Sequence, residues 1–199
     1  MFLTTRGADP IQSLIAYDKL NVKLCGTYCG LSDSYDGASH QAITDLAFVR
    51  AIPNMTVITV ADAVETKKAV FAIAEHQGPV YLRLSRAAAP VFYPEDMKFE
   101  IGRGIKVREG GDVTIITTGT VLHKAWQRQS FWKKRESGQR VVDMHTIKPI
   151  DEGTDYRMRQ GDGRHRDRGG TLCLRRTGKR CGGSPGRAYA GTHDPHRGH

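Results

Sequence analysis

The sequence predicts an α/β protein in which a domain built on a parallel sheet precedes a smaller, incomplete second α/β domain. Three features lead to this fold class. Residues 56–85 read as a strand, a helix and a strand, the order in which a crossover helix joins two parallel strands. Residues 111–125 read as a buried strand and the start of a helix, after an extended segment. Beyond residue 152 the Val, Ile and Phe side chains that build a core almost disappear, which predicts a disordered tail.

The first domain begins with a helix, a strand and a loop. Apolar side chains recur at helical spacing over residues 9–18, and the apolar run in residues 20–28 predicts a short buried strand. Residues 30–41 are rich in Gly, Ser and Asp, a composition that favours a loop. Because loops held by a rigid scaffold often carry binding residues, we expect this segment to shape a site.

A second helix and the strand–helix–strand unit follow the loop. The pattern becomes helical from Gln41, and Pro53 ends this helix because proline disfavours helical backbone in the residue before it. Residues 56–60 then predict a strand. Asp62 and Glu65 have the spacing of a capping box, which predicts that the next helix starts at this point.

The last strand of the first domain, residues 80–85, ends beside Arg86. In a parallel sheet with right-handed crossovers, ligands bind beyond the carboxyl ends of the strands. The loop 30–41 and Arg86 both lie at such ends. This edge of the sheet is therefore the predicted ligand site.

Composition divides the chain into four parts. The linker is punctuated by prolines, and RVVDMHTIKPID predicts a strand followed by a turn near the end of the second domain. The four parts are a first domain at residues 1–88, a linker at 89–106, a partial second domain at 107–152 and a disordered basic tail at 153–199.

The net charge of +9 lies entirely in the last part of the chain. Met1 to Ala125 holds 13 basic and 13 acidic residues, whereas Trp126 to His199 holds 17 basic and 8 acidic residues. A basic chain can bind nucleic acid by releasing counterions from phosphates. This tail lacks interleaved aromatic residues and any folded nucleic-acid motif, so we do not expect nucleic acid as a partner. A basic-tailed nucleic-acid-binding protein is the alternative function.

The cysteine spacing and the hydropathy pattern indicate a cytoplasmic protein. The four cysteines form no CxxC pair and no evenly spaced framework, which argues against a disulfide scaffold. No stretch approaches the roughly 20 apolar residues that span a bilayer, and no cationic segment with an apolar run opens the chain. We therefore expect no membrane partner.

Six blocks of the chain, taken together and in order, resemble the C-terminal half of transketolases. They are FLTTRGADPIQSLIAY, LNVKLCGTYCGLS, DGASHQAITDLAFVRAIPNMTVITVADAVET, GPVYLRLSR, GDVTIITTGT and RVVDMHTIKPID. Gln41 after His40 favours transketolase over the deoxyxylulose-phosphate synthases, which usually carry a second histidine there. The resemblance implies an incomplete pyrimidine-binding domain of the thiamine-diphosphate fold, followed by an incomplete transketolase C-terminal domain.

The resemblance also implies a function, because this family transfers two-carbon ketol units between sugar phosphates with thiamine diphosphate. By this resemblance, the ring of Phe2 packs on the aminopyrimidine, and Asp36 and His40 are the catalytic residues that reach sugar hydroxyls. Arg86 binds the substrate phosphate. These side chains suit aromatic stacking, hydrogen bonding and bidentate phosphate binding. Tyr28 stands at a substrate-binding position where the family usually has histidine, which implies altered donor chemistry.

The resemblance further implies that this chain is truncated and lacks a complete active site. The family's catalytic glutamate belongs to a block that precedes FLTTR, and a separate domain holds the diphosphate and its magnesium ion. We expect a diphosphate-binding domain or subunit as the partner, in a homodimer or a heterotetramer, and no activity without it. The GDG at residues 161–163 resembles the family's metal motif, but no asparagine follows Asn54, so we expect no metal site here.

Residues 163–199 suggest translation in the wrong frame. Codons chosen for GRHRDRGGTLCLRRTGKRCGGSPGRAY and read one base later can spell AAIVTVEEHSVYGGLGSAVAEVLAEHT, which has the apolar pattern that the family has at this place. We hypothesise one frame slip near Gly153 and two more between Trp126 and Gln139. The basic charge is then a by-product of the frame, and a non-functional product of a broken gene is a further alternative.

Overall fold

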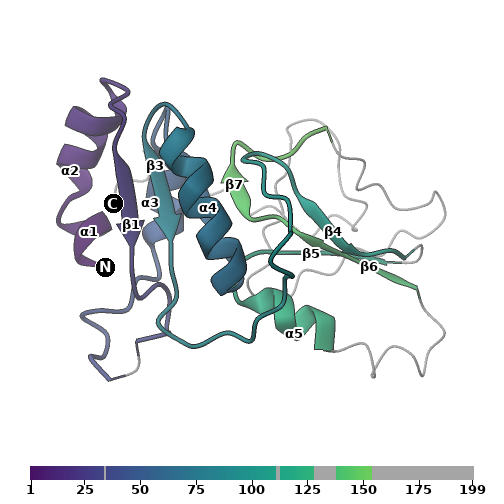
Figure 1. Ribbon diagram of the computed structural model, residues 1–199. Helices are drawn as coiled ribbons and strands as arrows, with labels where there is room; N and C mark the ends of the chain where they lie inside the picture. Colours follow the sequence, from purple (N-terminus) through teal and green to yellow (C-terminus); the bar gives the residue numbers. More distant parts are fainter. Residues whose placement is uncertain (34, 111–112, 128–137, 154–199) are drawn as a thin grey trace, which may run out of the picture.

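The computed structural model shows two sheets, the first of them covered by helices (Figure 1). The described residues are 1–33, 35–110, 113–127 and 138–153. Nearly all of the predicted tail, and most of the segment with two predicted frame slips, lies outside these residues. Every helix in the described part is too short or too polar to cross a lipid bilayer.

Thirteen elements follow one another along the described chain. They are α1 (Phe2–Thr5), α2 (Ala8–Pro10), the π-helix η1 (Ile11–Ala16), β1 (Lys23–Gly26), α3 (Asp45–Ala51), β2 (Thr56–Thr59), α4 (Ala63–Glu75), β3 (Val80–Arg83), β4 (Ile105–Arg108), β5 (Val113–Thr117), α5 (Val121–Gln127), β6 (Gln139–Asp143) and β7 (Thr146–Lys148).

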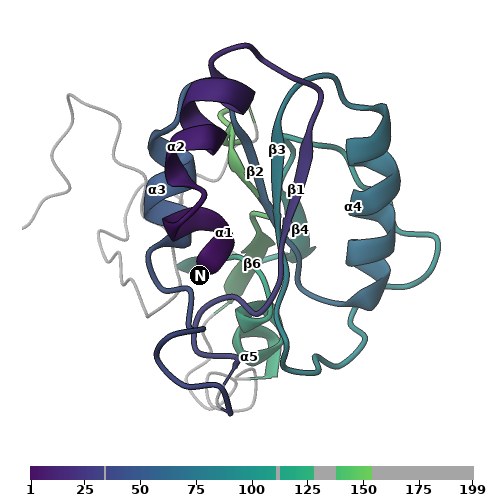
Figure 2. The ribbon, with the colours of Figure 1, turned by 90° about the vertical axis from the view of Figure 1, so that its left-hand side faces the viewer.

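The first sheet has the strand order β1-β3-β2-β7. Strands β1, β3 and β2 are parallel, and β7 pairs antiparallel with β2. Helices α1, α2 and α3 cover one face of this sheet, and α4 covers the other (Figure 2). Because both faces are covered, all four residues of β2 are buried. The predicted α/β class with a parallel sheet is confirmed.

The predicted strand–helix–strand unit is present as β2, α4 and β3. The side chain of Asp62 accepts a hydrogen bond from the backbone N–H of Glu65 at 2.8 Å, and the Glu65 carboxylate accepts one from Ala61 at 2.6 Å. These two bonds satisfy backbone donors at the start of α4, as a capping arrangement should. The other Asp62 oxygen accepts the N–H groups of Phe92 and Tyr93, which ties the connecting segment to the helix start.

The second sheet has the order β4-β6-β5, with β5 parallel and β4 antiparallel to β6. After β6 the chain passes from this sheet to the first one. Met144 donates its N–H to the Thr117 carbonyl at 2.7 Å, and the His145 carbonyl accepts the N–H of Thr59 at 2.8 Å. The segment predicted as a strand and a turn therefore forms two strands, one in each sheet.

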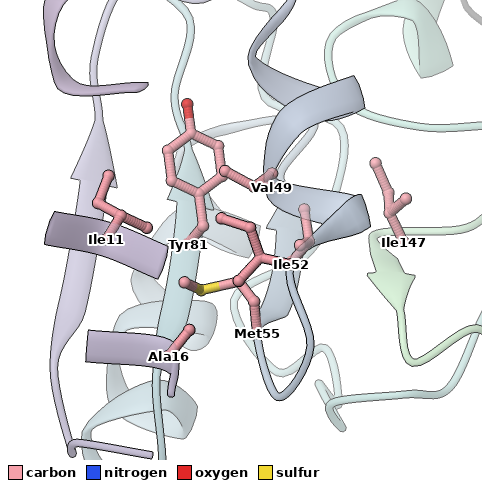
Figure 3. Packing of buried hydrophobic residues seen from close by; sticks show 8 residues of the cluster. Ile11, Ala16, Val49, Ile52, Met55, Tyr81 and Ile147 are labelled. Atoms are coloured by element: carbon pink, nitrogen blue, oxygen red, sulfur yellow. The ribbon is translucent and has the colours of Figure 1, made fainter. Parts of the chain in front are cut away.

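The core of the first domain lies on both faces of its sheet. One cluster fills the space between the sheet and the N-terminal helices, and the ring of Tyr81 lies beside Val49 within it (Figure 3). A second cluster packs α4 against the opposite face, with Ile58, Ala69 and Leu82 at its centre. Residues this completely buried fix the positions of the strand ends at the predicted ligand edge.

Two helices differ from the sequence prediction at their starts or in their winding. The predicted helix 9–18 is formed by α2 and η1 and winds partly as a π-helix. The helix predicted from Gln41 begins at Asp45. The reason for the later start is that the Ala42 carbonyl accepts the N–H of Gly30 at 2.8 Å and so takes part in a bridge between loop segments.

The linker prediction missed a strand. Strand β4 begins inside the predicted linker 89–106 and pairs antiparallel with β6. Other parts of this segment are packed as well, since Tyr93 is buried and Phe99 packs against the cluster under α4. An edge strand of four residues depends on its partner, and that partner lies more than 30 residues further along the chain.

Candidate functional site

A hollow of about 190 Å³ opens at the carboxyl end of β1, beside α1. Three predicted site residues, Phe2, Tyr28 and His40, line it together. The remaining lining residues are Met1, Leu3, Thr4, Cys25, Gly26, Thr27, Ala42 and Tyr81. None of these side chains is Asp, Glu, Lys or Arg, so the hollow suits a flat, weakly charged ring better than a charged group.

Phe2 contributes an accessible aromatic ring to the hollow. It lies on α1 and is 40% exposed. The His40 ring meets it at nearly a right angle, with 4.9 Å between the ring centroids. The guanidinium of Arg6, a residue that the sequence analysis did not single out, lies 4.5 Å from the centroid of the Phe2 ring. A heterocycle that stacks on Phe2 must take the face that Arg6 leaves open, or displace that exposed side chain.

His40 is held by the loop that the sequence analysis identified. Its backbone N–H donates to the Gly37 carbonyl at 3.0 Å, and its Nδ1 lies 3.0 Å from the Ser39 hydroxyl. The described residues give Nε2 no hydrogen-bond partner. Nε2 is therefore the atom of His40 that can donate to or accept from a ligand.

Tyr28 lies between the hollow and Arg86, the predicted phosphate-binding residue. The Tyr28 φ of 63° lies in the left-handed region, which is uncommon for a side chain of this size. This backbone conformation carries a ring that lines the hollow and also lies 5.1 Å from the guanidinium of Arg86.

Arg86 and Asp36 lie next to the hollow and do not line it. Arg86 Nη1 lies 3.6 Å from Asp36 Oδ2 and forms an ion pair with the buried Asp33. Burial alone would raise the pKa of Asp33, but hydrogen bonding to Asp36 and the charge of Arg86 outweigh it, so that pKa lies below its ordinary value. The five predicted residues thus lie in two adjoining groups: Phe2, Tyr28 and His40 line the hollow, and Arg86 with Asp36 lies beside Tyr28.

A buried ion pair between Asp45 and Arg83 lies next to Tyr81, which lines the hollow. Asp45 Oδ2 accepts hydrogen bonds from the Tyr81 hydroxyl at 3.0 Å and from Arg83 Nε at 2.7 Å. Arg83 Nη2 completes a bidentate contact with Asp45 Oδ1 at 3.2 Å. Burial and the neighbouring Asp45 carboxylate raise the pKa of Tyr81, so its hydroxyl stays neutral and remains a donor.

Sequence reasoning missed Asp33, Arg6 and this ion pair. Asp33 belongs to the loop that was predicted to shape a site, and this was the available signal. Its burial against Arg86 brings together residues 53 positions apart and depends on the folded sheet.

Two segments of the chain match known domain families. Residues 1–91 match the model of the transketolase pyrimidine binding domain, and residues 102–164 match that of the transketolase C-terminal domain.

Three relatives illustrate the similarity in sequence. A protein of Methanocaldococcus jannaschii named as a transketolase C-terminal section is 44% identical, over 76% of this chain and 49% of its own length. The 6-deoxy-6-sulfo-D-fructose transketolase subunit SqwH of Clostridium sp. is 36% identical over 76% and 47%. A subunit of the apulose-4-phosphate transketolase of Phocaeicola vulgatus is 33% identical over 75% and 48%. The chain thus spans about half the length of these curated relatives.

Two solved structures show the same fold. A split gene transketolase, described as an inactive beta4 tetramer, superposes with a TM-score of 0.69 at 43% identity, over 75% of this chain and 48% of that chain. The transketolase of Campylobacter jejuni superposes with a TM-score of 0.67 at 23% identity, over 78% and 25%.

Proposed function

This chain belongs to the transketolase family, which uses thiamine diphosphate, and on that premise we propose that its first domain binds the aminopyrimidine of the cofactor together with a sugar phosphate. The observation that carries the proposal is an aromatic hollow at the carboxyl edge of a parallel sheet, lined by His40 and by no Asp, Glu, Lys or Arg side chain. When bound, the cofactor would supply an electron-accepting thiazolium ring for cleavage of a carbon–carbon bond.

The residues of the hollow have distinct proposed tasks. Phe2 offers a ring face on which the aminopyrimidine can stack. His40 uses Nε2 to hold or move a proton at a sugar hydroxyl, while Ser39 fixes the orientation of the imidazole through Nδ1. Asp36, next to Arg86, contacts a hydroxyl at the outer end of the sugar. Arg86 binds the anionic end, and Tyr28 forms the wall between the two groups.

The proposed enzyme needs a second polypeptide or domain. No side chain of the hollow is Asp, Glu, Lys or Arg, so none can balance the charge of a diphosphate. Among the described residues there is also no group of three His, Cys, Asp or Glu side chains that could hold a metal ion. Two relatives are named as transketolase subunits, and one solved relative is an inactive beta4 tetramer. We propose that a diphosphate-binding subunit completes the site in a heterotetramer, and that this chain alone neither binds the cofactor tightly nor turns over.

Reconstitution tests this proposal. The purified chain is titrated with thiamine diphosphate and magnesium by calorimetry, alone and with the diphosphate-binding subunit of a split transketolase. Ketol transfer from a ketose phosphate to an aldose phosphate is followed in a coupled assay. We expect binding and turnover in the mixture only. Micromolar binding or turnover above background by the chain alone would contradict the division of the site.

Matched variants connect the activity to the hollow. Phe2→Ala should raise the cofactor concentration for half-maximal activity about tenfold through the lost stacking. Phe71→Ala is the control, because Phe71 lies on α4, on the other face of the sheet, and is 65% exposed. His40→Ala should lower kcat about 100-fold. Equal effects of the two phenylalanine substitutions would exclude a stacking role for Phe2.

A further inference from the structure

The guanidinium of Arg86 is already engaged by acidic side chains of its own chain. Asp33 and Asp36 both approach the same nitrogen, Nη1. The Asp33 side chain is completely buried, and its pKa is held below the ordinary value, so it carries a full charge at neutral pH. The charge of Arg86 is therefore already balanced by a buried carboxylate at this point of the site.

The fold holds this arrangement in place. The backbone N–H of Arg86 donates to the Ser32 hydroxyl at 3.2 Å, and the Gln41 side chain donates to the Asp33 carbonyl at 3.3 Å. The rings of Tyr28 and Tyr35 lie 5.1 Å and 5.4 Å from the guanidinium. Loop 30–41 and the end of β3 are thus connected by hydrogen bonds and by charge.

One edge of the guanidinium is left for a ligand. The described residues give Nε and Nη2 of Arg86 no hydrogen-bond partner, while both carboxylates occupy Nη1. A tetrahedral oxyanion can receive two N–H groups from this edge. A second negative charge on the oxyanion is opposed by Asp33. Over about 6 Å near a protein surface, such repulsion weakens binding by a factor on the order of ten or more.

We propose that Asp33 is a specificity-determining residue that makes Arg86 prefer a substrate end with one negative charge over a doubly charged one. The preferred chemistry is a singly charged oxyanion, such as a sulfonate or a singly protonated phosphate ester. This inference rests on the proposed function, in which Arg86 binds the anionic end of the sugar.

Two inorganic probes test the preference on the full chain. Methanesulfonate carries one charge and sulfate carries two, and both are tetrahedral. Each is titrated at pH 7 and constant ionic strength, and binding is followed by NMR at the Nε–H signal of Arg86. We expect methanesulfonate to bind about tenfold more tightly than sulfate. Asp33→Asn should raise the sulfate affinity about tenfold and remove most of the preference, whereas the distant, exposed Asp18→Asn should change neither.

The outcomes separate this inference from the proposed role of Arg86. The role of Asp33 is overturned if the two ions bind equally, or if a folded Asp33→Asn variant keeps the preference. Either result leaves the proposed role of Arg86, binding of the anionic end of the sugar, in place. Binding that survives Arg86→Ala overturns both proposals. Thermal unfolding checks that each variant folds. If Asp33→Asn does not fold, the half-exposed Asp36→Asn carries the test, and an unchanged sulfate affinity in that variant contradicts the inference.

Discussion

Glu65 and Asp143 meet across the junction of the two sheets, and each keeps one buried carboxylate oxygen without another hydrogen-bond partner among the described residues. Glu65 Oε2 accepts the N–H of Ala61, and Asp143 Oδ2 accepts the hydroxyl of Tyr93 at 2.7 Å. The remaining oxygens are Glu65 Oε1 and Asp143 Oδ1. We predict that the two carboxyl groups share one proton, which satisfies both oxygens.

This pair predicts that stability falls as the pH rises towards neutrality. Burial, followed by the charge of Asp143, raises the pKa of Glu65 well above its ordinary value, and burial raises the pKa of Asp143 to about 7. Between pH of about 4 and 7 the folded state therefore binds more protons than the unfolded state. The pair stabilises the folded state fully below pH of about 4, and this stabilisation is lost as the pH rises towards 7. The free energy of unfolding falls by up to about 1.4 kcal/mol per pH unit for each extra proton that the folded state binds.

Urea denaturation at several pH values, with Asp143→Asn beside the parent chain, measures this contribution. The comparison is needed because burial lowers the pKa of His145 to about 4, and that histidine makes stability rise between pH of about 4 and 6.5. The difference between the two chains isolates the carboxyl pair. We expect the variant to lose less stability than the parent as the pH rises from about 4 to 7. Parallel pH dependences would show that the pair shares no proton.

Removal of the Asp45 carboxylate should destabilise the protein strongly. Asp45 is completely buried and binds both Tyr81 and Arg83, whose side chain is only 16% exposed. Asp45→Ala leaves that guanidinium buried without its partner and should cost about 3–5 kcal/mol. Glu95→Ala is the control, because it breaks the exposed pair with Lys67 and should cost less than about 1 kcal/mol. Equal midpoints of chemical denaturation would refute the structural role of Asp45.

Gly26 is required by the close approach of Tyr81. A Cβ at this position would collide with the Tyr81 hydroxyl and ring edge. Gly26→Ala should therefore destabilise the chain by about 1–3 kcal/mol. Tyr81→Phe removes one of the colliding atoms, so the double variant should lose less stability than the sum of the single variants. Additive losses in denaturation experiments would mean that the hydroxyl is not the obstacle.

The sequence was sufficient where local rules decide the structure. Asp62 and Glu65 cap a helix because their spacing alone brings them to the same turn. Loop 30–41 and Arg86 lie at the same edge because strand ends in a parallel sheet share an edge. The residues that failed prediction depend on distant partners. Strand β4 needs β6, and the burial of Asp33 needs Arg86.

Charged residues show this limit most clearly. Asp45 and Asp143 look like surface residues in the sequence, yet both are buried. Their burial depends on partners 36 and 50 positions away, in the contacts between Tyr81 and Asp45 and between Tyr93 and Asp143. Local periodicity contains no information on such pairs, because it describes which face of an element is apolar and not which polar groups meet across the fold.

Two substitutions of Tyr28 distinguish the strain of its backbone from the contacts of its ring. Asparagine tolerates the left-handed region better than tyrosine, so Tyr28→Asn should relieve about 1 kcal/mol of strain. It also removes the ring that lies over Arg86, a contact worth about 0.5–1 kcal/mol at an exposed site. The free energy of unfolding should therefore change little. In the reconstituted enzyme, however, kcat/KM should fall about tenfold because a wall of the hollow is lost. Tyr28→Phe keeps the ring and the backbone conformation and should stay within about threefold of the parent. If Tyr28→Asn retains full activity at unchanged stability, Tyr28 has no part in substrate binding.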